Sequence, residues 1–404
     1  MDDATGMDMA RLLVMLDRER RLHRKFSIQA SHLGRDLAAA SEEPAPEGFV
    51  SRIARLCGIS AKAPRRSPRK KPAVAGGCSI VIPTWRDNAF VRKAVASCLA
   101  QTAGADGLQI LLCVNGGDTE YFERLRGEYG GDARIEVLRT GRADPNAARR
   151  LGVEAAKMPF LAFVDDDDEI TPGFVERLRG FFADPNTNIA IGALRECGGD
   201  DGQPQSPGGS RLSRPDGVIA DTLRSAGSGA TQDRRELSPV LSSFCYRLFR
   251  TAFFKRAFRI SDSALPFAED VVFWVENFAA IEGPVRCDSP DAPEFYIRRM
   301  TGDSRSRPAS SRGAAAGIRP HLECLETLSR FALDVGRTIE ERCFAVSKIE
   351  ARAGMISKLV ASLDGAAKTA ALDAIRASGN PFTFLCTEAS DSRPASVRND
   401  TYHK

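Results

Sequence analysis

FLAFVDDDDE, residues 160–169, joins five apolar side chains to five acidic ones. An apolar run of this length, bounded on its far side by Thr171, Pro172 and Gly173, predicts a buried parallel strand with the acids at its carboxyl end. Open α/β sheets bind their ligands at that edge. The stretch therefore predicts an α/β fold class and the place of a functional site.

The four aspartates of this stretch need a partner for their charge. Two like charges about 4 Å apart repel by roughly 4 kcal/mol at an effective dielectric of about 20, so adjacent carboxylates require a cation, protonation or solvent. A hard divalent ion is the simplest of these. Along an extended strand Asp165 and Asp167 lie on one side and Asp166 and Asp168 on the other, so the first pair can share a metal and a phosphate. The alternative is an acidic turn that caps the next helix.

Composition limits what surrounds this site. A chain of 404 residues with 43% hydrophobic content predicts two to three domains and a substantial core. The net charge of +4, from 57 basic and 53 acidic residues, gives no support for a nucleic-acid partner. Ten cysteines without a CxxC pair, and only four histidines, argue against structural zinc and favour reduced thiols in a cytosolic compartment.

The beginning of the chain predicts the location of the protein. Met1, Asp2 and Asp3 are not the start of a signal peptide, and no apolar run approaches the roughly 20 residues that a transmembrane helix needs. We therefore expect a cytoplasmic protein that is neither secreted through a signal peptide nor integral to a membrane.

Composition also divides the chain into five segments. Residues 1–40 have helical apolar spacing and predict a helix, and residues 41–77, rich in proline and basic side chains, predict a linker. An α/β domain is expected over 78–310, a helical region over 311–380 and a tail over 381–404.

The two N-terminal segments predict contacts rather than chemistry. The apolar stripe of the first helix is too narrow for a core element, so we expect it to pack on another chain, as in a homo-oligomer, or on the C-terminal helices. The linker carries RRSPRKK at residues 65–71. A solvated charge run is the favoured interpretation, and peripheral contact with anionic headgroups at the inner face of a membrane, or with nucleic acid, is the alternative.

Strand-like and helix-like segments alternate after residue 78. Four such pairs in tandem imply a parallel sheet with right-handed crossovers. A fifth strand is expected at 189–195, and the polar stretch from 198 to 230 is expected to be a functional or disordered loop. The four pairs are residues 78–84 and 90–99, 109–114 and 118–129, 134–138 and 145–156, and 160–164 and 172–182.

Motifs in this order resemble those of family 2 glycosyltransferases. Residues 78–84 resemble the opening strand of that family, AARRLG at 147–152 its Ala-Arg-Asn-x-Gly helix, and FVDDDD at 163–168 its DxD strand end. FAEDVVFW at 267–274 resembles its Glu-Asp motif. The resemblance ends with the tail segment that closes over the phosphates, here Tyr296, Ile297, Arg298, Arg299, Ser304 and Arg305.

The resemblance implies a Rossmann-like glycosyltransferase-A fold, a nucleotide-sugar donor and Mn2+ or Mg2+ as cofactor. A metal would neutralise the diphosphate as it departs. Asp167 is the first candidate for a direct metal ligand. By resemblance Asp165 reaches the ribose or the metal, Asp166 belongs to the donor site and Asp168 supports the turn.

The acceptor and the phosphates need residues of their own. An attacking hydroxyl loses a proton, and the resemblance places Asp270 as the base, with Glu269 orienting the acceptor or the sugar. The alternative is that both only supply charge to a helix N-terminus. Guanidinium groups suit phosphate oxygens, and a surface charge is the alternative for each. The candidates are Arg298, Arg299 and Arg305.

One departure from the family pattern concerns the nucleotide base. The second strand ends in VNGGD, residues 114–118, where many members have Asp-Asp-Gly-Ser. Asn115 therefore replaces a carboxylate near the base or ribose. An amide both donates and accepts hydrogen bonds, so the usual uridine assignment does not follow.

Other positions complete the expected donor site. Arg149 keeps the basic position of the family helix, whereas Arg150 replaces its asparagine. The first strand ends in Pro83, Thr84 and Trp85, which are assigned to the donor site. Trp85 either stacks on the base or packs against the protein.

The resulting hypothesis is a metal-dependent, inverting glycosyltransferase. It moves a sugar from a nucleotide diphosphate to a hydroxyl of a glycan or lipid-linked acceptor, in surface polysaccharide synthesis. A single candidate base favours inversion over double displacement. The alternatives are a sugar-nucleotide nucleotidyltransferase, which would lack the Glu269 and Asp270 helix, and a non-catalytic glycan-binding or scaffold protein.

Overall fold

The computed structural model describes part of the chain. The described residues are 76–102, 107–116, 118–198, 230–232, 241–262, 265, 267–289, 292–300, 314–383 and 385–386. They belong to the second of two compact units, residues 71–404, whereas the first unit is residues 1–70. The predicted N-terminal helix, almost all of the linker and most of the predicted tail lie outside the described residues.

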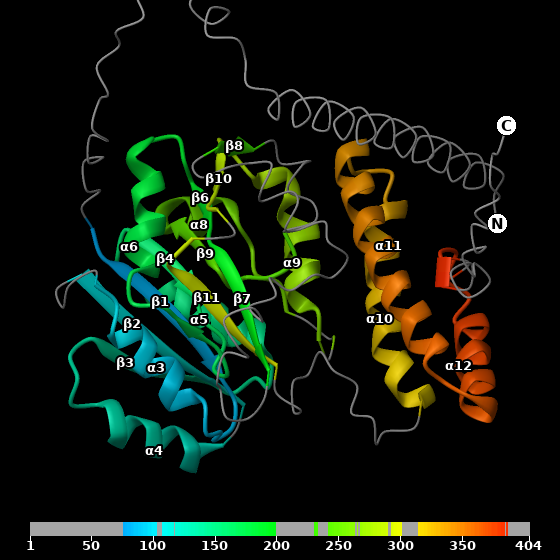
Figure 1. Cartoon of the computed structure of the whole chain (residues 1–404), viewed down its shortest axis with the longest axis horizontal. Coiled ribbons are helices and arrows are strands. Elements are labelled where there is room, and N and C mark those ends of the chain that lie inside the picture. Colours follow the sequence, from blue (N-terminus) through cyan, green and yellow to red (C-terminus); the bar gives the residue numbers. More distant parts are fainter. Residues whose placement is uncertain are drawn as a thin grey trace, which may run out of the picture. The chain divides into compact units, whose positions relative to one another are not determined.

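A mostly parallel sheet of eight strands forms the centre of the described unit (Figure 1). Strand β1 (Cys78–Thr84) lies between β2 (Leu108–Asn115) and β4 (Phe160–Phe163), parallel to both. Every residue of these three strands is buried, which explains their continuous apolar sequence. The predicted α/β class with a mostly parallel sheet is confirmed.

The remaining strands extend this sheet on both sides. The order is β3-β2-β1-β4-β9-β6-β10-β8, in which β9 is antiparallel to both of its neighbours and β8 is antiparallel to β10. Each of these antiparallel pairs includes a strand that comes after the four predicted strand-helix units in the chain. Their bounds are β3 (Ile135–Thr140), β6 (Ile189–Ile191), β8 (Ala230–Gln232), β9 (Arg247–Arg250) and β10 (Val285–Cys287).

The helices of the first half follow the predicted positions. Helix α4 is capped by Asp118, and α5 is capped by Asp144 with Pro145 in its first turn. Gly152 lets α5 lie close on the sheet, because a Cβ there would be 2.5 Å from the Val81 side chain. The helices are α3 (Val91–Leu99), α4 (Thr119–Tyr129), α5 (Pro145–Ala155) and α6 (Phe174–Arg179), and the last continues as the 3-10 turn η2 (Gly180–Ala183).

A second, three-stranded sheet lies beside the acidic turn. Its order is β5 (Glu169–Ile170), β11 (Phe295–Met300) and β7 (Ala193–Gly198). The predicted strand 189–195 is thus divided at Gly192 between two sheets. A Cβ at Gly192 would lie 2.5 Å from the Phe174 ring, so only glycine lets the chain cross there.

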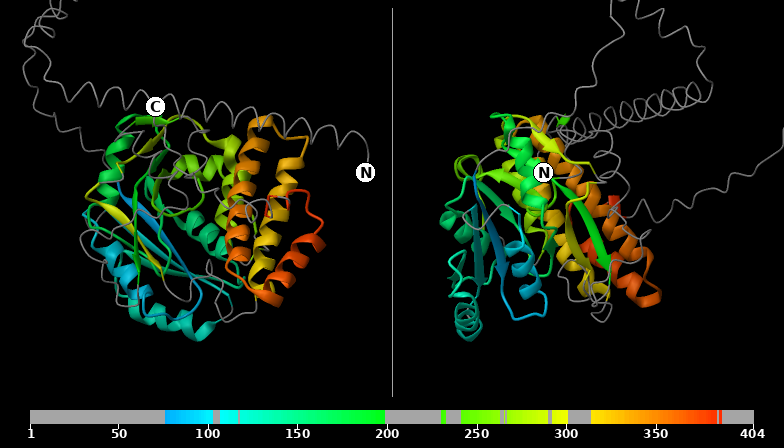
Figure 2. Two further views of the ribbon diagram at one scale, coloured as in Figure 1. Left: turned by 45° about the vertical axis from the view of Figure 1, so that its right-hand side comes forward. Right: turned by 60° about the vertical axis from the view of Figure 1, so that its left-hand side comes forward.

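Helices complete the C-terminal half of the unit. Helix α8 (Thr251–Ala257) follows β9, and α9 (Glu269–Asn277) continues as η3 (Phe278–Ala280). Helices α10 (Ala314–Leu333) and α11 (Ile339–Ala361) contact α9, and α12 (Gly365–Ala377) packs on both (Figures 1 and 2). The predicted helical C-terminal region is confirmed. No helix among the described residues is both long and apolar enough for a bilayer crossing.

Candidate active site

The acidic residues form a turn rather than a continued strand. Strand β4 ends at Phe163, and the amide of Asp168 donates to the carbonyl of Asp165 over 3.1 Å. Because the extended conformation stops before the acids, simple alternation does not describe them. Asp165, Asp166 and Asp167 are partly exposed, whereas Asp168 is buried.

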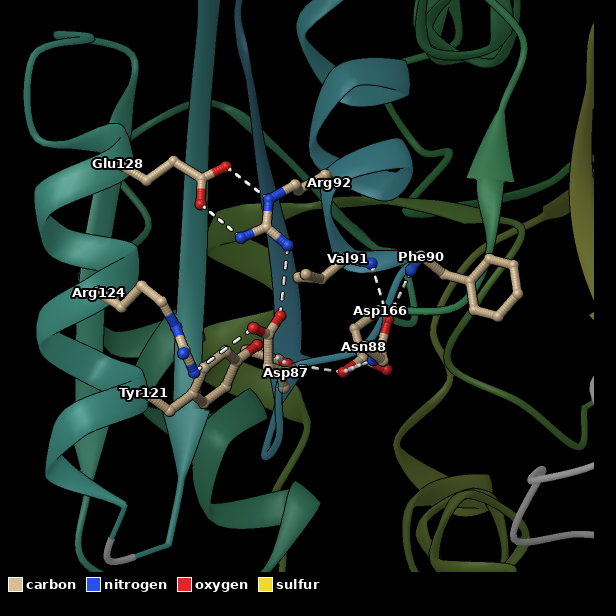
Figure 3. Close-up of polar contacts among 10 residues, drawn as sticks. Asp87, Asn88, Phe90, Val91, Arg92, Tyr121, Arg124, Glu128 and Asp166 are labelled. Carbon is tan, nitrogen blue, oxygen red and sulfur yellow. Dashed lines mark hydrogen bonds and ion pairs between the residues drawn. The ribbon is translucent and has the colours of Figure 1, made fainter.

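Asp166 points toward the end of β1 and the start of α3 (Figure 3). Its Oδ2 accepts from Thr84 Oγ1 over 2.6 Å and from Asn88 Nδ2 over 3.2 Å. Thr84 Oγ1 also shares a hydrogen bond of 2.7 Å with Tyr121 OH, from α4. The acidic turn is therefore bonded to the loop after β1 and, through Thr84, to α4.

Asn88 extends this connection to the helix that follows. Its Oδ1 accepts from the amides of Phe90 and Val91, each over 2.8 Å, so it satisfies the N-terminal amides of α3 (Figure 3). The turn, the loop and the helix N-terminus thus share one hydrogen-bond network. Exposed ion pairs of Arg92 with Glu128 and Asp87 lie farther out and contribute little to stability.

Strand β11 holds the other side of the turn. Tyr296 OH donates to Asp168 Oδ2 over 2.7 Å and accepts from the amide of Asp165 over 3.2 Å. The amide of Arg299 donates to Asp168 Oδ1 over 2.8 Å. Burial, together with the neighbouring Asp167, raises the pKa of Asp168 well above its ordinary value. These bonds fix the turn from the second sheet.

Arg149 joins the turn to α9. Its guanidinium is buried, 2.8 Å from Glu269 Oε1 and 3.3 Å from Asp165 Oδ1. It also lies 4.7 Å from the centre of the Phe244 ring. Burial disfavours its charge, but Glu269 and Asp165 outweigh burial and raise its pKa. Asp165 and Glu269, which are about a hundred residues apart in sequence, therefore contact the same guanidinium.

Asp270 is the carboxylate next to this pair. Burial, with Glu269 beside it, raises the pKa of Asp270 to about 7, although Arg149 opposes the shift. Its Oδ1 accepts from the amide of Val271 over 2.8 Å. Ala268, the residue before Glu269, has φ 64°, a left-handed conformation that alanine rarely adopts. A carboxyl group with a pKa near 7 can take or release a proton near neutral pH.

The acidic turn supplies oxygen ligands of the kind that divalent cations prefer. Burial, with Asp165 and Asp166 nearby, raises the pKa of Asp167 to about 7, which indicates uncompensated negative charge. Within the described ranges, no three or more His, Cys, Asp or Glu side chains are grouped to hold an ion by themselves. Mg2+ commonly takes one or two carboxylates plus substrate phosphates, so Asp165 and Asp167 fit that role.

The candidate phosphate ligands differ in exposure. Arg298 is 35% exposed and lies 4.0 Å from Glu196. Arg299 is buried in an ion pair with Glu169, its guanidinium 5.4 Å from the centre of the Phe90 ring. Arg298 is therefore the more accessible of the two. Arg305 lies outside the described residues.

The candidate base-binding residues lie at the ends of β1 and β2. Asn115 is buried and pairs in register with Thr140 of β3. Pro83 lies within β1 and is buried. Trp85 is 44% exposed, and the Arg86 guanidinium lies 4.9 Å from the centre of its ring. Trp85 is thus a partly exposed indole just beyond the end of β1.

Arg150, which replaces the family asparagine, faces away from the acidic turn. It donates to the carbonyl of Ile260 over 2.8 Å and pairs with Asp262 over 2.6 Å. These residues line a cavity of about 890 Å³ beside α5 and α8. Arg149 and Arg150 thus contact different parts of the molecule from the same helix.

Sequence reasoning missed Asn88 and Tyr121, and it named Tyr296 only as part of the tail segment and not as a support of the acidic turn. Asn88 precedes an apolar run, which is the pattern of an N-terminal helix cap, and that signal was available. Tyr121 and Tyr296 reach the turn through tertiary contacts, for which sequence spacing gives no signal.

Comparison with known proteins connects this geometry to a family. Residues 79–258 match the model described as Glycosyl transferase family 2. The "Uncharacterized glycosyltransferase EpsJ" of Bacillus subtilis is 27% identical over 209 residues, 50% of this chain and 56% of the relative. The "Putative glycosyltransferase EpsH" of the same organism is 30% identical over 101 residues, 25% of this chain and 28% of the relative. The chain thus spans about half, or less, of the length of these relatives.

Solved structures show partial likeness. S. aureus TarS 1–349 in complex with UDP-GlcNAc has a TM-score of 0.49 at 11% identity, covering 77% of this chain and 90% of TarS 1–349. The mannosyltransferase PcManGT from Pyrobaculum calidifontis, in complex with GDP-Man and Mn2+, has a TM-score of 0.45 at 14% identity, covering 90% and 93%. Likeness at this level does not transfer the ligands of those structures to this chain.

Proposed function

The chain carries a family 2 glycosyltransferase domain, and we propose that it transfers a sugar from a nucleotide-diphosphate donor to an acceptor hydroxyl. The observation that carries the proposal is the bridge through Arg149. This guanidinium contacts Asp165 of the acidic turn and Glu269 of α9, so it joins the two motifs that the reaction needs. Glu269 and Asp270 lie outside the segment that matches the family.

The donor side of the proposal is the acidic turn. Asp165 and Asp167 would hold Mn2+ or Mg2+, and a bound cation would neutralise the diphosphate as it departs. Arg298 would add a second positive charge at the phosphates, because its guanidinium is partly exposed. Arg299 and Arg305 remain candidates for the same role.

The acceptor side of the proposal is the start of α9. Glu269 is held in place by its ion pair with Arg149, which suits orientation of the sugar or acceptor. Asp270, with a pKa near 7, suits removal of the hydroxyl proton. Attack assisted by one base displaces the nucleotide directly and inverts the anomeric centre.

The nucleotide and the acceptor are narrower proposals. Asn115 and Trp85 would contact the base, with Thr84 and Pro83 forming the strand end beneath it, and Asp166 would act by fixing that strand end. The acceptor would be a glycan or a lipid-linked carbohydrate in surface polysaccharide synthesis. Its recognition, a membrane contact through the linker and a homo-oligomer through the N-terminal helix would involve residues outside those described.

One feature favours sugar transfer over the alternatives. A nucleotidyltransferase needs no carboxylate base opposite its diphosphate, whereas here Glu269 and Asp270 lie beside the acidic turn through Arg149. A scaffold protein needs neither the buried guanidinium of Arg149 nor a carboxyl group with a raised pKa, such as that of Asp270.

A donor screen tests the proposal. UDP, GDP, CDP and dTDP sugars are incubated with the full chain, with and without Mn2+, and release of the nucleoside diphosphate is measured. We expect release from one nucleotide class, dependent on the metal and lost in Asp270→Asn. Equal release from the Asp270→Asn variant, or release of pyrophosphate instead, would contradict it.

A further inference from the structure

The C-terminal helices contribute a polar cluster directly behind the candidate catalytic pair. His321 of α10 and Arg352 of α11 are both only 7% exposed. Arg352 Nη1 lies 3.2 Å from His321 Nδ1, and because arginine can only donate, the imidazole nitrogen accepts. Burial and the neighbouring Arg352 lower the pKa of His321 to about 4, so the imidazole is neutral.

Both side chains rest on one aromatic ring. The Arg352 guanidinium lies 5.1 Å from the centre of the Phe267 ring, and the His321 ring meets Phe267 edge to face at 4.9 Å. Phe267 comes two residues before Glu269. The cluster therefore acts on the chain segment that enters α9.

The cost of this cluster suggests a purpose beyond packing. Arg352 Nε is buried without a hydrogen-bond partner, and no carboxylate among the described residues forms an ion pair with Arg352. A buried guanidinium without a counter-ion is unfavourable, and an apolar residue of similar volume would pack at lower cost. The hydrogen bond to His321 and the contact with Phe267 are the features that distinguish an arginine from such a residue.

The segment that Phe267 leads into has an unfavourable backbone conformation. Ala268 has φ 64°, and its carbonyl accepts from the amides of Val271 and Val272 over 3.1 and 3.3 Å. An alanine in this region is disfavoured by about ten-fold relative to a right-handed conformation. Such conformations persist where the surroundings determine them.

We propose that Arg352 and His321 are positioning residues for the transfer reaction, acting through Phe267. They hold the left-handed corner at Ala268 and thereby the place of the carboxylate pair that follows it. The C-terminal helices are in this way part of the catalytic unit. The inference rests on the proposed function, because it assigns Glu269 and Asp270 to the reaction.

A matched pair of variants tests the inference. Arg352→Met removes the contact with Phe267, whereas Arg342→Met removes an arginine of the same helix that is 8% exposed and donates to the carbonyl of Ala332. We expect Arg352→Met to lower kcat by about ten- to a hundred-fold while donor Kd changes less than about two-fold. Arg342→Met should keep parental kcat at temperatures where it is folded.

A second measurement does not depend on activity. Hydrogen exchange of the Val271 and Val272 amides should accelerate in Arg352→Met and stay parental in Arg342→Met, because these amides bond to the Ala268 carbonyl. Phe267→Leu, which leaves Arg352 in place, should reproduce the acceleration and serves where Arg352→Met does not fold. Exchange at parental rates in both variants would overturn the inference.

Glycine at the corner gives a test of mechanism. Glycine adopts positive φ without the penalty of alanine, so Ala268→Gly should restore part of the kcat that Arg352→Met loses. A double variant no faster than Arg352→Met alone would overturn the role of the corner. The proposed function fails separately, if Asp270→Asn retains parental turnover while the exchange result stands.

Discussion

The two sides of the candidate site are built differently. On the donor side, the acidic turn, Thr84 and Asn115 lie at the ends of adjacent parallel strands, and sheet register sets their positions. On the acceptor side, Glu269 and Asp270 begin a helix behind a strained corner, and C-terminal helices pack against it. Only the donor side lies within the segment that matches the family.

This difference separates binding from chemistry. A site on strand ends is rigid, because each strand is fixed by hydrogen bonds to its neighbours, and it suits the donor. A site at a helix start, placed by side-chain contacts, can be adjusted by changing a few residues. Substitutions on the donor side are therefore expected to change donor binding, and substitutions on the acceptor side are expected to change turnover.

The largest expected effect comes from a substitution on the acceptor side alone. Asp270→Asn keeps shape but removes the base, so turnover should fall by about a hundred- to ten-thousand-fold, with donor Kd within a few-fold. Steady-state rates and calorimetry measure the two quantities. Equal losses in turnover and donor affinity would mean that the two sides are not separable, and full turnover would place the base elsewhere.

The next largest effect is expected from a substitution on the donor side. Asp167→Asn removes a charged ligand and relieves repulsion, so metal-dependent donor binding should weaken by at least the roughly 10- to 100-fold typical of outer-shell changes, while thermal stability is kept. Calorimetry with and without Mn2+ measures this. Asp132→Asn, in the connection before β3, is the control. An unchanged manganese dependence would refute the ligand assignment.

A smaller effect sharpens the comparison by testing support for the donor side. Tyr296→Phe removes the hydrogen bonds to Asp168 and to the Asp165 amide, so Mn2+ affinity should fall by about ten-fold without loss of the fold. Titration of the full chain with Mn2+ alone measures it. Tyr129→Phe at the end of α4 should leave the affinity at the parental value, and an equal effect there would argue against a specific role for Tyr296.

The same contrast explains what sequence reasoning could predict. Residues 160–164 are apolar because β4 is buried on both faces, so pattern alone located the strand and the acids after it. The four strand-helix units were predictable for the same reason. The expected alternation of side chains along an extended strand does not describe Asp166. The strand ends at Phe163, and a turn sets the direction of the Asp166 side chain.

Other features had no sequence signal. The second sheet pairs Tyr296 with Ile170 and Leu194, strands of two to six residues that are distant along the chain. The division at Gly192 depends on the nearby Phe174 ring. The meeting of Asp165 and Glu269 on Arg149 was not predicted, because about a hundred residues separate the two carboxylates and only tertiary contacts bring them together.

The smallest effect concerns the pH dependence of the acceptor side. A base acts only when deprotonated, and the pKa of Asp270 is raised to about 7 by burial and by Glu269, so kcat/KM should rise with pH through about 7 and then level. Glu269→Gln removes the negative neighbour and leaves Arg149 beside the site. The loss of the Glu269 charge and the remaining charge of Arg149 both favour the ionised form of Asp270, so the rising limb of the pH profile should move to lower pH. The ratio of variant to parental kcat/KM should therefore be several-fold higher at pH 6 than at pH 8, whatever the absolute loss. Glu282→Gln, which removes an exposed ion pair with Arg256, should leave the limb in place. A limb that stays fixed in Glu269→Gln, or moves to higher pH, would show that the titrating group is not Asp270.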